Sequence, residues 1–122
     1  MNYNVVFHVD LADAGRLAFA FKNVKNYLKF LRTLPDMGNA KLVVVGNGPV
    51  VRFFVASEEN AALAEAGAQV MAEGVSIRLC VNALNDFGIR PEDLWPGVGV
   101  AADGGITELA RLQQEGYGYV KP

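Results

Sequence analysis

Cys80 carries the most nucleophilic side chain near the end of any predicted strand. It follows an apolar run at residues 75–79 and precedes a short predicted helix at residues 81–87. The backbone amides and the positive dipole end at a helix N-terminus favour the thiolate, which is the form that attacks sulfur and binds metals. A small buried side chain that fills the end of the sheet is the alternative interpretation. The position alone leaves a chemical role and a packing role open.

Polar and glycine-rich groups follow the other predicted strands. His8 closes the first strand, and its imidazole can act as a general base, sense charge near Cys80 or serve as a structural hydrogen-bonding group. The turns at residues 46–48 and 103–105 can bring backbone amides close to an anion, or be plain tight turns. The residues predicted to bind or orient a substrate beside Cys80 are His8, Asn47, Gly48, Asn82 and Gly104.

The cysteine, histidine and glycine content argues against a bound metal or nucleotide cofactor. The chain has one cysteine and one histidine, whereas a zinc site usually takes three or four protein ligands. Its glycine-rich turns match neither the spaced glycines of a dinucleotide site nor the Gly-Lys-Ser/Thr ending of a phosphate loop. We therefore expect no metal, ATP, NAD or other cofactor.

The charge and hydropathy of the chain argue against nucleic-acid and membrane functions. The chain has eleven Lys and Arg and thirteen Asp and Glu, so it lacks the clustered basic excess that phosphate binding requires. No uninterrupted apolar run approaches the roughly 18 residues of a membrane span. The first residues lack the basic segment of a signal peptide, and a single cysteine cannot form an intrachain disulfide. We therefore expect a cytoplasmic protein.

Short β-rich runs alternate along the chain with segments of helical periodicity. The predicted strands cover residues 3–9, 41–45, 75–79, 98–101 and 117–120. The predicted helices cover residues 13–33, 57–74 with Ser57 as the N-cap, 81–87 and 104–115, with a further short helix at residues 50–55. This alternation predicts one α/β domain over residues 1–122, with three α/β/α layers around a mainly parallel five-stranded sheet.

The predicted topology brings the candidate residues to one edge of the sheet. In an open parallel sheet, ligands bind outside the carboxyl ends of the strands. Cys80, His8 and the two glycine-containing turns all lie just at or beyond such ends. We therefore expect a common site at this edge.

The chain is rich in apolar side chains, at 52% of its residues. Such a surplus indicates strands covered on both faces, a subunit interface, or both. Four phenylalanines are candidates for that interface: Phe19, Phe30, Phe53 and Phe54. Four basic residues on the first long helix are instead expected to face solvent: Lys22, Lys25, Lys29 and Arg32.

A pattern of residues in the second half of the chain is similar to that of a known family. It comprises residues 80–84 (Cys-Val-Asn-Ala-Leu), 88–89, 92–94, 96–98, 105–109, 112–113, 115–117 and 121–122, preceded by weaker matches at residues 7–10 and 22–28. The pattern resembles the DsrE/DsrF-like (YchN-like) family. The resemblance implies a three-layer α/β fold, a homotrimer or homohexamer and, in the sulfur-handling members, a persulfide-carrying cysteine at the position of Cys80.

One position departs from the pattern of the family and leaves two hypotheses open. Relatives often carry a histidine in the turn after the second strand, where this chain has Asn47. An amide can orient a substrate but takes no proton at neutral pH. The first hypothesis is a sulfur-relay protein that carries sulfane sulfur on Cys80 and passes it to a thiol of a sulfur-carrier partner. The second is a non-catalytic oligomeric module that binds a small anion or a protein.

Overall fold

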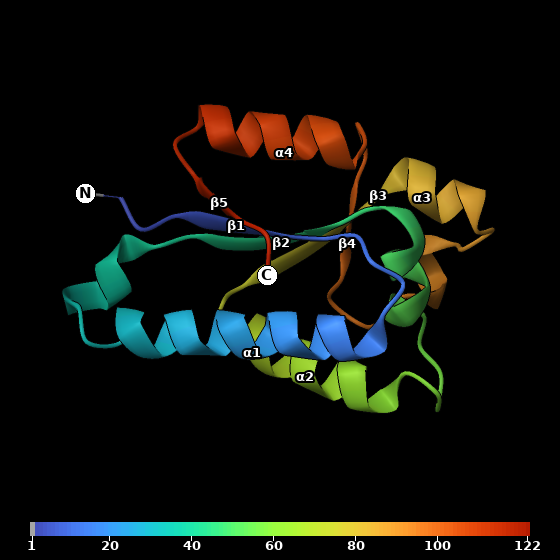
Figure 1. Cartoon of the computed structure of the whole chain (residues 1–122), viewed down its shortest axis with the longest axis horizontal. Helices are drawn as coiled ribbons and strands as arrows, with labels where there is room; N and C mark the ends of the chain where they lie inside the picture. Colours follow the sequence, from blue (N-terminus) through green and yellow to red (C-terminus); the bar gives the residue numbers. More distant parts are fainter. Residues whose placement is uncertain (1) are drawn as a thin grey trace.

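The computed structural model describes residues 2–122 and shows one five-stranded sheet with strand order β4-β3-β2-β1-β5 (Figure 1). Every pairing between neighbouring strands is parallel, as the sequence predicted for most of the sheet. The strands are β1 (Val5–Val9), β2 (Leu42–Gly46), β3 (Ser76–Cys80), β4 (Gly99–Ala101) and β5 (Gly118–Val120). All carboxyl ends therefore point to one edge, and the predicted α/β class is confirmed.

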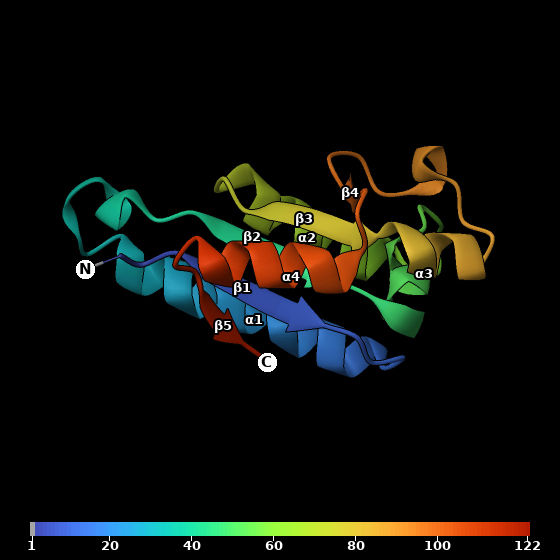
Figure 2. The same ribbon diagram turned by 90° about the horizontal axis from the view of Figure 1, so that it is seen from above.

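The helices cover the two faces of the sheet unequally. The long helices α1 (Ala14–Leu31) and α2 (Ala61–Ala72) lie side by side on one face, and α4 (Gly105–Gln114) lies alone on the other (Figure 1). Figure 2 shows α4 crossing over β1, β2 and β3, with β5 beside β1 at the edge of the sheet. The short helix α3 (Val81–Asp86) follows β3 at the carboxyl edge.

Helix α1 forms where the apolar stripe predicted it. Asp13 is the N-cap, and its carboxylate accepts a hydrogen bond from the backbone amide of Arg16. The buried face follows the three- and four-residue steps of an amphipathic helix. Its members are Leu17, Ala20, Phe21, Val24, Leu28 and Leu31. The four basic residues of this helix are exposed, as expected.

The two faces of the sheet carry separate apolar clusters. On the α1 and α2 side, the rings of Phe21, Phe54 and Trp95 pack together, with 4.5 Å between the ring centroids of Phe54 and Trp95. Gly67 of α2 allows this packing, because a Cβ atom there would lie 2.6 Å from the Trp95 ring. On the α4 side, a smaller cluster consists of Val6, Val43, Val45, Leu109 and Leu112.

The segment between β2 and α2 differs from its prediction in detail. The predicted short helix is a 3-10 helix, η2 (Gly48–Phe54). Ser57 is not the N-cap of the following helix, because α2 starts at Ala61 with Asn60 before it. The Ser57 hydroxyl accepts a hydrogen bond from the Asn60 backbone amide, and the Asn60 side chain donates to carbonyls of η2 and of the residue after it. Tertiary bonding through Asn60 therefore sets the start of α2.

The four phenylalanines assigned to a subunit interface lie in different environments. Phe54 is fully buried in the core beside Trp95, so its assignment to an interface was wrong. Phe53 is half-buried against the same core. Phe19 and Phe30 are 46% and 45% exposed on α1. Of these four phenylalanines, only Phe19 and Phe30 present a large apolar surface to solvent.

Candidate functional site

Cys80 is the last residue of β3 and immediately precedes α3, as the sequence predicted. Its backbone is extended, with φ −61° and ψ 123°, and the next residue starts the helix. The residue is only 7% exposed in the single chain. Cys80 is therefore buried at the carboxyl edge of the sheet.

The first residue of α4 lies against Cys80. A Cβ atom on Gly105 would lie 3.1 Å from the Cβ of Cys80, 3.6 Å from its Sγ and 3.0 Å from the Cβ of Asn47. Gly105 therefore brings its backbone into contact with both side chains, which no larger residue could do without a shift. The thiol and the Asn47 amide flank the same short piece of helix backbone.

Asn82 and Gly104 meet on another side of this backbone. Gly104 precedes α4 with φ +95°, a left-handed conformation that favours glycine. A Cβ atom there would lie 3.1 Å from the Nδ2 atom of Asn82. The Asn82 amide thus lies against the turn that leads into α4, two residues beyond Cys80 in the chain.

His8 is buried and bonded through both nitrogens of its ring. Its Nε2 lies 2.6 Å from the Oδ1 of Asn47, and its Nδ1 lies 2.6 Å from the hydroxyl of Tyr119. A carbonyl oxygen only accepts, so Nε2 is the donor in the bond to Asn47. When Nε2 carries the only proton of the ring, Nδ1 accepts from the tyrosine hydroxyl. His8 therefore reaches the site through Asn47, and among residues 2–122 it forms no hydrogen bond with Cys80.

Gly48 stands apart from the other candidates. It has φ +67°, and a Cβ atom on it would lie 3.6 Å from the backbone carbonyl of Asp10. The turn is held by a hydrogen bond from the Asn47 backbone amide to the carbonyl of Val9. Gly48 therefore shapes the turn that carries Asn47, and the structure does not bring it to Cys80.

Sequence reasoning missed two groups near these residues. Tyr119 of β5 is the partner of His8, although 111 residues separate them. Glu108 of α4 is buried and accepts hydrogen bonds from Arg78 of β3 at 3.2 Å and from Arg111 at 3.5 Å. Glu108 therefore ties α4 to the strand that ends in Cys80.

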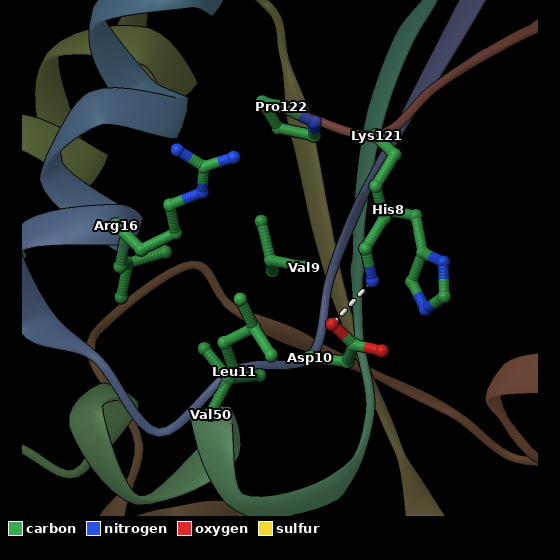
Figure 3. A pocket seen from close by; sticks show the side chains of 9 residues that line it. His8, Val9, Asp10, Leu11, Arg16, Val50, Lys121 and Pro122 are labelled. Atoms are coloured by element: carbon green, nitrogen blue, oxygen red, sulfur yellow. Dashed lines mark hydrogen bonds and ion pairs between the residues drawn. The ribbon is translucent and has the colours of Figure 1, made fainter.

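A small pocket lies beyond His8, at the carboxyl ends of β1 and β5 (Figure 3). Lys121 pairs with Asp10 on one side, and the Arg16 guanidinium lies across the pocket from them. Cys80 is not among the residues that line it. Within residues 2–122, no group of three or more His, Cys, Asp or Glu side chains could hold a metal ion.

Comparison with known families identifies the chain. The model of the DsrE/DsrF-like family matches residues 3–122. The chain belongs to the DsrE/DsrF-like family. A search of curated proteins gave no match.

Three solved structures resemble this DsrE/DsrF-like domain over nearly its whole length. MTH1491 from Methanobacterium thermoautotrophicum, a protein of unknown function, is 29% identical with a TM-score of 0.83, covering 99% of this chain and 100% of its own. The YchN protein of E. coli is 18% identical with a TM-score of 0.72 and full coverage of both chains. BT1422 from Bacteroides thetaiotaomicron, also of unknown function, is 12% identical with a TM-score of 0.62, covering 96% and 94%.

The site of this DsrE/DsrF-like domain is made of one thiol and two side-chain amides around the start of α4. Cys80 can act as a nucleophile when it is deprotonated. Asn47 and Asn82 can donate hydrogen bonds to an anion or accept them from a neutral ligand. Among residues 2–122, no helix is both long enough and apolar enough to cross a membrane.

Proposed function

We propose that this protein is a sulfur relay that carries sulfane sulfur as a persulfide on Cys80. The observation that carries the proposal is the position of the chain's single thiol, at a strand-to-helix junction and against the start of α4 beside Asn47. The DsrE/DsrF-like family match supports it, because the family is generally linked to sulfur relay. Cytoplasmic thiol pools would keep such a cysteine reduced between cycles, and we place the protein there.

The transfer is a pair of thiol exchange steps. The Cys80 thiolate attacks the outer sulfur of a donor persulfide, R–S–SH, and the S–S bond of the donor breaks. The donor leaves as a thiolate, and Cys80 holds the outer sulfur and its proton as Cys80–S–SH. The thiolate of an acceptor on a sulfur-carrier protein then attacks that outer sulfur and releases the Cys80 thiolate. No oxidant or reductant is consumed.

Mass measurement after exposure to polysulfide tests the proposal. The wild-type protein should gain about 32 Da for each sulfur bound, and dithiothreitol should remove the gain. Cys80→Ser should stay at its original mass under the same treatment. Wild-type protein that takes up no sulfur would overturn the carrier function.

The burial of Cys80 favours a second candidate function. A thiol in a residue that is 7% exposed can serve as packing, leaving the surrounding amides to bind a small anion or the surface to bind a protein. In that non-catalytic module, the native protein would be alkylated far more slowly than free cysteine. Sulfur uptake by the native protein at a rate comparable to free cysteine would exclude this candidate.

We further propose that the chain assembles into a homotrimer or homohexamer. Phe19 and Phe30 expose nearly half of their surface on α1. A contact between subunits would cover these exposed rings. The sulfur donor and acceptor would then approach the assembled oligomer at the carboxyl edge of each sheet.

A further inference from the structure

A row of three hydrogen-bonded side chains runs across the α4 face of the sheet toward Cys80. Tyr119 of β5, His8 of β1 and Asn47 after β2 are joined by two hydrogen bonds of 2.6 Å each. In the neutral ring with its proton on Nε2, both bonds are donated in the same direction, from the tyrosine hydroxyl to Nδ1 and from Nε2–H to the asparagine oxygen. The outer end is open to solvent, since Tyr119 is 43% exposed, whereas His8 is 8% exposed.

The hydrogen bond from His8 occupies the oxygen of the Asn47 amide and leaves its NH₂ group without a bond from the row. Its oxygen is held by His8, and within residues 2–122 the hydrogen-bond network gives its nitrogen no partner. The Cβ of Asn47 lies against Gly105, which also contacts Cys80. The group that the row leaves free for a ligand is therefore the NH₂ donor of a residue that shares its contact with Gly105 with Cys80.

The packing on this face of the sheet is compatible with an apolar side chain at the position of His8. The neighbouring side chains on this face, Val6, Val43 and Val45, form an apolar cluster. A buried imidazole is tolerated only when its polar atoms are bonded, and here two further polar residues supply those bonds. Packing on this face of the sheet therefore does not explain a histidine at position 8.

We propose that His8 and Tyr119 are positioning residues that turn the Asn47 amide so that its NH₂ group recognises an anionic sulfur species at Cys80. The preferred sulfur donors are then those that carry a negative charge, such as a polysulfide anion, over a neutral thiol or disulfide. This inference rests on the proposed sulfur-relay function and adds the residues that favour a negatively charged donor. Tyr119 acts only through His8, and His8 acts only through Asn47.

The preference of Cys80 for an anionic reagent provides the test. Iodoacetate and iodoacetamide are similar in size and both alkylate a thiolate, but only iodoacetate is charged. The quantity measured is the rate with iodoacetate divided by the rate with iodoacetamide, normalised to the same ratio for free cysteine. Hydrogen bonds to charged acceptors are about twice as strong as those to neutral ones, so the wild-type ratio should exceed that of free cysteine.

Five variants separate positioning from simple loss of stability, because both reagents meet the same folded protein. Asn47→Leu should lower the ratio about fivefold or more, since it removes the donor. His8→Leu should lower it about threefold, whereas His8→Gln, which keeps a donor for the Asn47 oxygen, should stay close to wild type. Tyr119→Phe should lower it about twofold, and the matched control Tyr117→Phe should leave it unchanged.

Nitrogen NMR of His8 supplies a second readout that stability does not affect. With a neutral ring, the wild-type protein should carry its proton on Nε2, and Tyr119→Phe should weaken this tautomer preference. A wild-type proton on Nδ1 would overturn the inference. So would a His8→Leu ratio equal to wild type, a His8→Gln ratio as low as that of His8→Leu, or a thiol that reacts with neither reagent.

The two proposals fail in different measurements. If polysulfide leaves the mass of the protein unchanged while the alkylation ratios follow the pattern above, the relay function is wrong and the positioning of Asn47 stands. If Cys80 takes up sulfur but the ratios do not respond to the His8 variants, the relay function stands and the positioning role is wrong.

Discussion

The backbone of Gly105 lies directly against the side chain of Cys80. A Cβ atom on Gly105 would lie 3.1 Å from the Cβ of Cys80 and 3.6 Å from its sulfur. Because Gly105 is also the first residue of α4, the position of this helix sets the wall of the candidate site. Changes that move or fill this contact should therefore alter the chemistry of the thiol.

Substitution of Gly105 by alanine should slow sulfur uptake and destabilise the protein. The added methyl group would stand between Cys80 and Asn47 and cover one side of the sulfur. Such overpacking costs about 1–3 kcal/mol, measurable by urea unfolding. Gly15→Ala is the matched control, because a Cβ there meets only the Asp13 carboxylate at 3.4 Å, near the start of α1. Uptake at the wild-type rate in Gly105→Ala would show that α4 does not limit access.

Loss of Arg78 should destabilise the protein by about 1–2 kcal/mol, because it leaves the buried Glu108 carboxylate with a weaker partner. This loss of stability is smaller than for a fully buried ion pair, because the Arg78 side chain is 37% exposed and water screens its charge. Arg78→Met combined with Glu108→Leu should recover most of the loss, since no unpaired charge remains. Urea denaturation of the single and double variants measures both effects, and a double variant less stable than Arg78→Met would contradict this account.

The carboxyl group of Asp93 should titrate at a lower pH than an ordinary aspartate. A hydrogen bond from Arg90 holds the pKa of Asp93 below its ordinary value. The stability gained from this pair is therefore present above the unfolded-state pKa of Asp93. It is lost as the pH falls through the folded-state pKa. Carbon NMR of the carboxyl group should show the pKa of Asp93 rising in Arg90→Gln. Glu92→Gln is the control, since Glu92 lies 3.7 Å from the same guanidinium and leaves the Arg90–Asp93 bonds in place. An unchanged Asp93 titration in Arg90→Gln would rule out this cause.

Light scattering of the wild-type protein at micromolar concentration should give the mass of an oligomer, a multiple of the 13.1 kDa chain. Charged substitutions in the exposed phenylalanines, Phe19→Glu and Phe30→Glu, should shift it toward the monomer, because charge at an apolar contact is costly. Lys22→Glu reverses a charge on an exposed part of the same helix and should leave the assembly intact. A wild-type monomer would remove the proposal of a homotrimer or homohexamer.

The layout of the site was predictable because it depends on local patterns. Apolar runs broken by glycine and proline located the strand ends, and their alternation with helices implied a parallel sheet. Cys80 at the end of β3 and Asn47 after β2 follow from those two facts alone. The family resemblance added the expectation of sulfur chemistry and agrees with the match over residues 3–122.

The partners of the site residues were not predictable, because they depend on long-range packing. Nothing near Tyr119 in the sequence indicates that β5 pairs with β1 and brings the tyrosine to His8. A glutamate in the first turn of a helix is usually exposed to solvent. Glu108 is instead buried, because its carboxylate accepts a hydrogen bond from Arg78 of β3. Ser57 fits the pattern of an N-cap, but the bonds of Asn60 to the preceding segment move the start of α2.

The single tryptophan lies on the opposite side of the sheet from α4. Trp95 is buried among Phe21 and Phe54, and its indole nitrogen has no hydrogen-bond partner within residues 2–122. Its fluorescence therefore monitors the α1–α2 layer and gives little signal when α4 shifts. A melting curve followed by tryptophan fluorescence therefore reports on the core cluster that Trp95 shares with Cys80, and detachment of α4 requires a separate probe.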